Sequence, residues 1–88
     1  KARIQKITRG QIILGVGPRT ARFCIEGYLP GYGSPDFDIY PTDTIEIFSD
    51  GSTSKVQAEE VDGILALLCE QLNACGKTYQ IQRPSSNS

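Results

Sequence analysis

One segment of this chain, residues 58–75, carries the long helical pattern that most constrains the fold. Its apolar side chains recur at spacings of mostly three and four residues, at Val61, Ile64, Leu65, Leu68, Leu72 and Cys75. This period of 3.6 residues predicts an amphipathic helix with one apolar face. Gly76 follows the last periodic residue, where a glycine in left-handed conformation typically ends a helix. The apolar face has to be buried against another element, which the rest of the chain must supply.

The segments before this helix are short, rich in β-branched residues and partly alternating. They predict strands at residues 2–8, 11–16, 20–28 and 44–49, and a short return strand at 53–57. Turn residues separate them, among which Asp50-Gly51 is the strongest hairpin signal. Residues 78–82 are expected to form an edge strand. Ser54 and Gln57 also fit a capping box, which would start the helix earlier at the expense of the return strand.

Together these elements predict an α+β fold: an antiparallel sheet of four to six strands with one long C-terminal amphipathic helix packed on one face. With 88 residues there is room for one hydrophobic core, so we expect a single domain at 1–83 and a flexible polar tail at 84–88. No apolar run approaches the ~20 residues that span a bilayer. The basic N-terminal stretch, interrupted by Arg9 and Gly10, does not match a secretory signal peptide.

Residues 29–43 form the least regular segment. Three prolines and two glycines predict an irregular loop, which is long for a compact domain. The stretch 28–40 nevertheless holds four of the chain's seven aromatic residues. Protein interfaces are enriched in such rings, although rings in this position can equally fold back and close one end of the core.

Several classes of function are disfavoured by the composition. The chain has no histidine, so it lacks the commonest general base and metal ligand, and we expect no enzyme activity, cofactor or metal. Gly15-Val16-Gly17 lacks the third glycine of a dinucleotide loop and is read as a strand that ends in a turn. Asp36, Asp38 and Asp43 lack the glycine of a calcium loop and are read as solvated carboxylates.

Three cysteines, Cys24, Cys69 and Cys75, are few and odd in number. They are expected to be reduced thiols packed as small core residues in a cytoplasmic protein. A Cys69–Cys75 disulfide is not expected, because residues six apart on a helix lie roughly 9 Å apart along its axis.

Charge is unevenly distributed along the chain, although the net charge is only −1. Residues 1–22 hold six cations and no acid, whereas residues 23–74 hold all ten acids and one cation, Lys55. Such a split is typical either of two segments that neutralise each other in the fold or of two oppositely charged surfaces.

Two binding surfaces follow from these patterns, in two different classes of protein. The first hypothesis is a small non-enzymatic module that docks on another protein through the aromatic and acidic loop 29–43, whose acids suit a partner with a basic surface. Its contacts would come from Tyr28, Tyr32, Asp36, Phe37, Asp38 and Tyr40. The alternative is a nucleic-acid-binding protein that uses the basic N-terminal hairpin, through Lys1, Arg3, Lys6, Arg9, Arg19 and Arg22.

Leu67 lies off the main apolar stripe of the expected helix, so we also predict a homodimer contact there. The small size, the acidic middle and the lack of catalytic residue sets resemble accessory or inhibitor-like proteins of mobile elements and bacteriophages. This resemblance is one of composition, and no motif supports it.

Overall fold

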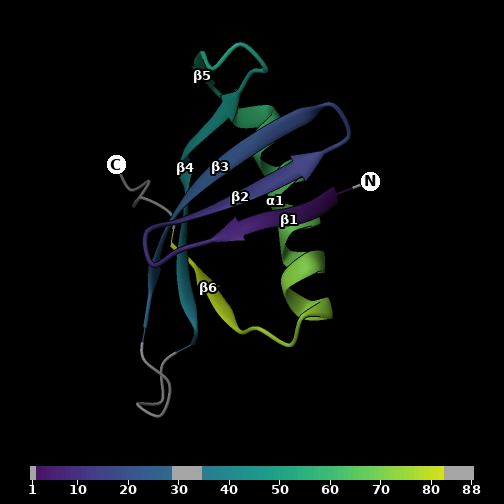
Figure 1. Cartoon of the computed structure of the whole chain (residues 1–88). Coiled ribbons are helices and arrows are strands. Elements are labelled where there is room, and N and C mark those ends of the chain that lie inside the picture. Colours follow the sequence, from purple (N-terminus) through teal and green to yellow (C-terminus); the bar gives the residue numbers. More distant parts are fainter. Residues whose placement is uncertain (1, 29–34, 83–88) are drawn as a thin grey trace, which may run out of the picture.

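A computed structural model describes residues 2–28 and 35–82. In chain order its elements are β1 (Ala2–Ile7), β2 (Gln11–Val16), β3 (Arg19–Gly27), β4 (Phe37–Ile47), β5 (Thr53–Lys55), α1 (Ala58–Ala74) and β6 (Tyr79–Ile81). The fold is α+β, with one helix packed on one face of a six-stranded sheet (Figure 1).

Five of the strands form an antiparallel ladder in the order β1-β2-β3-β4-β5. The sixth strand, β6, pairs with the first part of β4 and runs parallel to it. The predicted antiparallel sheet is confirmed for β1 to β5, and only β6 departs from it by pairing in parallel. The reason is that α1 carries the chain back along the sheet, so that β6 starts beside the beginning of β4 (Figure 1).

Within the segment 29–43, which was expected to be an irregular loop, residues 37–43 belong to β4 instead. Tyr40 lies opposite Cys24, and Ile45 lies opposite Arg22, so four residues of β4 bulge out against one residue of β3. Pro41 occupies the first position of this bulge, where its missing N–H interrupts no ladder hydrogen bond. Within the bulge the Thr44 hydroxyl donates to the Pro41 carbonyl at 2.7 Å. Pro41 therefore lies in the bulge of a strand and does not prevent the strand.

The core lies between the inner face of the sheet and α1. The helix contributes five buried residues, Val61, Ile64, Leu65, Leu68 and Leu72. From the strands come Ile12, Leu14, Ala21, Phe23, Ile25, Phe37 and Ile39. On the inner face Ile12 lies opposite Phe23, and Leu14 lies opposite Ala21.

The helix begins and ends close to the predicted residues. Gly76 has φ +75°, which confirms the expected left-handed conformation beyond the helix. The alternative with a capping box was wrong, because Ser54 lies in β5 and Gln57 caps the helix without a side-chain hydrogen bond. The hairpin signal at Asp50-Gly51 is confirmed: Gly51 has φ +91°, and the Asp50 carboxylate accepts a hydrogen bond from the Ser52 amide.

Two adjacent leucines of α1 provide a matched test of this packing. Leu68 is fully buried, whereas Leu67 is half-buried at the margin of the core. We expect Leu68→Ala to lower the free energy of unfolding by about 2–5 kcal/mol, because it removes apolar contacts and leaves a cavity. Leu67→Ala should cost roughly half as much or less. Urea denaturation of both variants measures the difference, and equal losses would contradict this placement of the helix.

Candidate interaction surface

The sheet has a second face, which points away from α1. Along each strand, the residues that alternate with the core residues lie on this second face. Residues that are opposite each other on neighbouring strands point to the same face. Among the residues that the structure describes, no helix packs on this outer face (Figure 1). We define the outer face by Arg3, Lys6, Gln11, Ile13, Arg22, Cys24, Glu26, Asp38, Tyr40, Ile45 and Lys55.

A single row of residues crosses this face from β1 to β5. Lys6 pairs with Ile13, Ile13 with Arg22, Arg22 with Ile45, and Ile45 with Lys55. Cations and isoleucines therefore alternate from strand to strand. Because neighbouring strands lie 4.7–4.9 Å apart, successive cations are about 10 Å apart at the backbone. We call these five residues the cation row.

Arg22 lies at the centre of the cation row and is half-buried. Within the described part of the chain its Nε–H is buried and has no acceptor. A buried donor without an acceptor costs folding free energy. Ile13 and Ile45 on either side of it are also half-buried.

Further along the outer face, two tyrosines are hydrogen-bonded to two carboxylates. The Tyr28 hydroxyl donates to Asp38 at 2.5 Å, and the Tyr40 hydroxyl donates to Glu26 at 3.3 Å. The hydrogen bond to Asp38 and the loss of solvent raise the pKa of Tyr28 to about 12. Burial and then the charge of Glu26 raise the pKa of Tyr40. Both phenols therefore remain protonated donors at neutral pH.

The residues predicted to bind a partner protein fall into two groups. Tyr28, which is 38% exposed, and the half-buried Tyr40 are accessible, whereas Phe37 is a core residue and Asp38 is buried beneath Tyr28. The half-buried Asp36 accepts a hydrogen bond from the Thr78 amide at 3.0 Å. Tyr32 lies outside the described residues. The alternative that rings from this segment close the core thus holds for Phe37.

A groove of about 420 Å³ lies at the end of the sheet. It is lined by Ile7, Thr8, Arg9, Gly27, Tyr28, Asp36, Phe37 and Lys77. Members of both predicted binding sets meet in it, since Arg9 belongs to the basic set and Tyr28 to the aromatic set.

The described residues of the predicted basic set do not share one surface. Arg3, Lys6 and Arg22 lie on the outer face, and Arg9 lies in the β1–β2 turn, whereas Lys1 lies outside the described residues. Sequence reasoning missed Lys55, because it lies far along the chain in an acidic region. The available signal in the sequence was its place in the expected return strand at 53–57. The structure pairs that strand with β4, so that Lys55 lies opposite Ile45.

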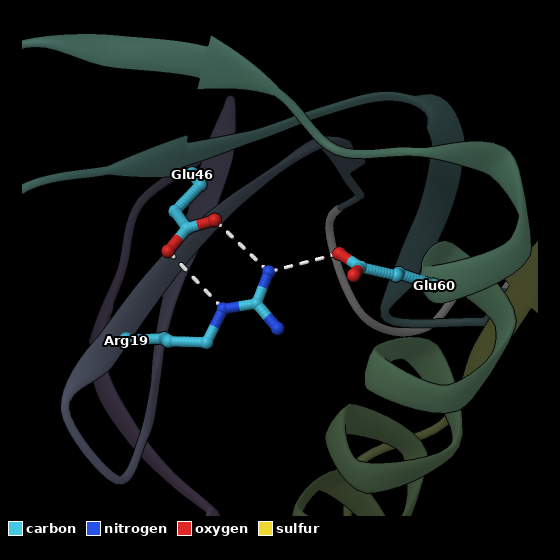
Figure 2. Close-up of polar contacts among 3 residues, drawn as sticks. All are labelled: Arg19, Glu46 and Glu60. Atoms are coloured by element: carbon cyan, nitrogen blue, oxygen red, sulfur yellow. Dashed lines mark hydrogen bonds and ion pairs between the residues drawn. The ribbon is translucent and has the colours of Figure 1, made fainter.

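Arg19, the remaining member, lies on the other side of the sheet and is engaged within the fold. Its Nε and one Nη bind both carboxylate oxygens of Glu46, at 3.1 and 2.9 Å, and the same Nη binds Glu60 of α1 at 2.9 Å (Figure 2). This cluster joins β3, β4 and the first turn of the helix. One alternative drawn from the sequence was that the two charged segments neutralise each other within the fold. The ion pairs of Arg19 with Glu46 and Glu60 are a case of such neutralisation.

The glycine pair near the second hairpin has a structural role. Gly15 lies within β2, where a β-carbon would be 2.4 Å from the Gln5 side chain, and Gly17 has φ +60° in the β2–β3 turn. A glycine with positive φ at the first central position is typical of a tight hairpin turn. The interpretation of this segment as a strand that ends in a turn is confirmed.

The cysteines are free, but their packing differs from the expectation. Of the two half-buried cysteines, Cys69 packs against the core, whereas Cys24 lies on the outer face. Cys75 is exposed at the end of the helix, so it is not a core residue. Its position beyond the last buried turn, after Leu72, explains the difference.

The searches for metal sites and membrane spans were negative for the part of the chain that is described. Across 2–28 and 35–82, no three His, Cys, Asp or Glu side chains gather where they could hold a metal ion. The helix found in these ranges is neither long nor apolar enough to cross a membrane. The structure contains one chain, so the homodimer contact at Leu67 stays a prediction.

No family model, no curated protein and no solved structure matches this chain. The geometry and chemistry of its surfaces therefore carry the functional assignment.

The Arg19 cluster generates a prediction about acid stability. Hydrogen bonds from Arg19 lower the pKa of Glu46 in the folded protein. A depressed carboxyl pKa stabilises the fold above the unfolded-state pKa, near 4.5, and this stabilisation is lost as the pH falls through the folded-state value. We expect Glu46→Gln to lower the melting temperature at pH 7 and to reduce its fall between pH 5 and 3.

Thermal melts across that pH range measure the effect, with Glu70→Gln as control because Glu70 is an exposed carboxylate elsewhere on α1. Parallel melting curves for wild type and Glu46→Gln would show that the ion pair does not contribute.

Proposed function

We propose that this protein is a small non-enzymatic protein-binding module that docks its partner on the outer face of the sheet. The observation that carries the proposal is the cation row, in which Ile13 and Ile45 lie between three cations without a covering element among the described residues. Apolar side chains at the centre of a patch with polar groups around them are typical of protein interfaces.

The aromatic and acidic residues expected to bind enter this proposal through Tyr40. Its ring is half-buried on the outer face. Tyr40 lies opposite Cys24 of β3, which is the next outer-face residue after Arg22 on that strand. Tyrosine buries a large area at little cost in conformational entropy and is frequent among residues that dominate binding energy. Tyr40 is therefore a contact at the margin of the cation row.

Free thiols support a reducing compartment, and we propose the cytoplasm. A module of this size with one core fits an accessory or inhibitor-like role, in which binding itself is the activity.

Substitution of the two isoleucines tests the proposal. We expect Ile13→Gln together with Ile45→Gln to preserve the circular dichroism spectrum and to abolish capture of the partner from an extract. In titration calorimetry with the purified partner, the double variant should bind at least tenfold more weakly, because the interface loses its apolar centre.

The matched control is Glu59→Gln with Glu70→Gln, since both side chains are exposed on α1, on the opposite side of the molecule. The control should bind as the wild type does. A partner that binds the isoleucine variant and the wild type equally would exclude the outer face as the docking site.

Nucleic-acid binding is the second candidate, favoured by the presence of Arg3, Lys6, Arg22 and Lys55 on one face. In that case short single-stranded DNA or RNA should bind with micromolar or tighter affinity in fluorescence anisotropy. The affinity should fall with salt, with a slope of about 0.7 for each neutralised phosphate. Absence of binding at low salt would exclude this candidate.

A further inference from the structure

We propose that the partner contributes an acidic amphipathic α-helix, which lies across the strands along the cation row. This inference rests on the proposed function and specifies the chemistry of the occupant. It follows from three properties of the row: its spacing, its charge and the central position of Arg22 between two isoleucines.

The spacing of the row matches the turns of a helix. Adjacent strands place a side chain every 4.7–4.9 Å, and an α-helix places one on a given face about every 5.4 Å. When a helix lies perpendicular to the strands, about one helical turn is therefore positioned above each strand. Its acidic residues would recur every seven positions, with an apolar residue three or four positions after each. An extended peptide does not fit this pattern, because its side chains alternate between faces at about 3.3 Å per residue.

The charge of the row selects acidic partners. Lys6, Arg22 and Lys55 lie in the row, and Arg3 lies one outer-face position away from Lys6 across the β1 bulge. Two described carboxylates of the outer face, Glu26 and Asp38, lie two outer-face positions beyond the row and are engaged by tyrosines. A third acid, the exposed Asp43, lies in the bulge of β4 two residues before Ile45, and its backbone carbonyl accepts from the Cys24 thiol. Three carboxylates on one face of a helix would therefore meet three cations.

Arg22 is the expected centre of the contact. As the middle cation of the row, its guanidinium would meet the middle carboxylate of the partner helix in a charge-assisted hydrogen bond. The isoleucines beside it would then lie under the apolar positions of the helix. A phosphate backbone could bind the cations but would leave these isoleucines without apolar contacts.

The acids of this chain's own helix do not follow the required pattern. Glu59, Glu60 and Asp62 cluster in the first turns, and Glu70 stands apart. A partner helix with acids seven residues apart therefore fits the row better than a second copy does.

A designed peptide tests the inference directly. The probe is a fluorescein-labelled helical peptide of about 15 residues with Glu at positions 1, 8 and 15 and Leu at positions 4 and 11, in an Ala- and Gln-rich background. The matched peptide has the same composition, with its three Glu residues moved to the opposite helical face. Anisotropy at low and high salt should show at least tenfold tighter binding of the first peptide, weakened by salt.

Substitutions in the row provide the second measurement. Arg22→Gln and Lys55→Gln should each weaken binding of the first peptide about fivefold or more. The control is Lys77→Gln, because Lys77 lies beyond α1 at the end of the sheet and outside the row. It should bind the peptide as wild type does.

The outcomes separate this inference from the proposed function. Equal affinity for both peptides, or a natural partner that needs Ile13 and Ile45 but tolerates Arg22→Gln and Lys55→Gln, would overturn the helical, acidic occupant and leave the docking face in place. A natural partner unaffected by the isoleucine variant would overturn the proposed function itself. Salt-sensitive binding of single-stranded nucleic acid, with no preference between the peptides, would also overturn the inference.

Discussion

The packing of α1 against one face of the sheet is the constraint on which the rest of this structure depends. Leu68 and Leu72 are fully buried, as are Ile12 and Phe23 on the sheet. In a chain of 88 residues the described part supplies one helix and one sheet, so a single layer covers a single face. The exposure of the outer face is a direct consequence, because no second described helix covers it.

The same arrangement separates charge between the two sides of the molecule. The helix carries four acids and no cation, whereas the outer face carries a row of three cations. Arg19 is the exception, since it crosses to the helix side and binds Glu46 and Glu60. By holding the first turn of α1 to β3 and β4, it joins the two layers where opposite charges meet (Figure 2).

Much of the fold could be predicted from local patterns. The apolar period of 58–75 and Gly76 predicted the helix and its end within one residue. Runs of β-branched residues predicted the first two strands closely, and partial alternation predicted the third. The segment around Pro41 could not be predicted this way, because proline is a local signal against a strand. Only the pairing of Tyr40 with Cys24 and of Ile45 with Arg22 shows that it lies in a bulge. The parallel pairing of β6 could not be predicted from local patterns either, since it depends on where the end of α1 places the following residues relative to the sheet.

By itself, the sequence determined the class of fold, the position of the helix and the separation of charge along the chain, because these depend on residue spacing and on composition. The tertiary structure alone decided which charges share a surface. Lys6, Arg22 and Lys55 come from three distant segments, and only strand register aligns them with Ile13 and Ile45. Register is a long-range property, since it depends on which side chains the common core accepts, and a shift of one residue in any one strand would turn that strand's member of the row inward.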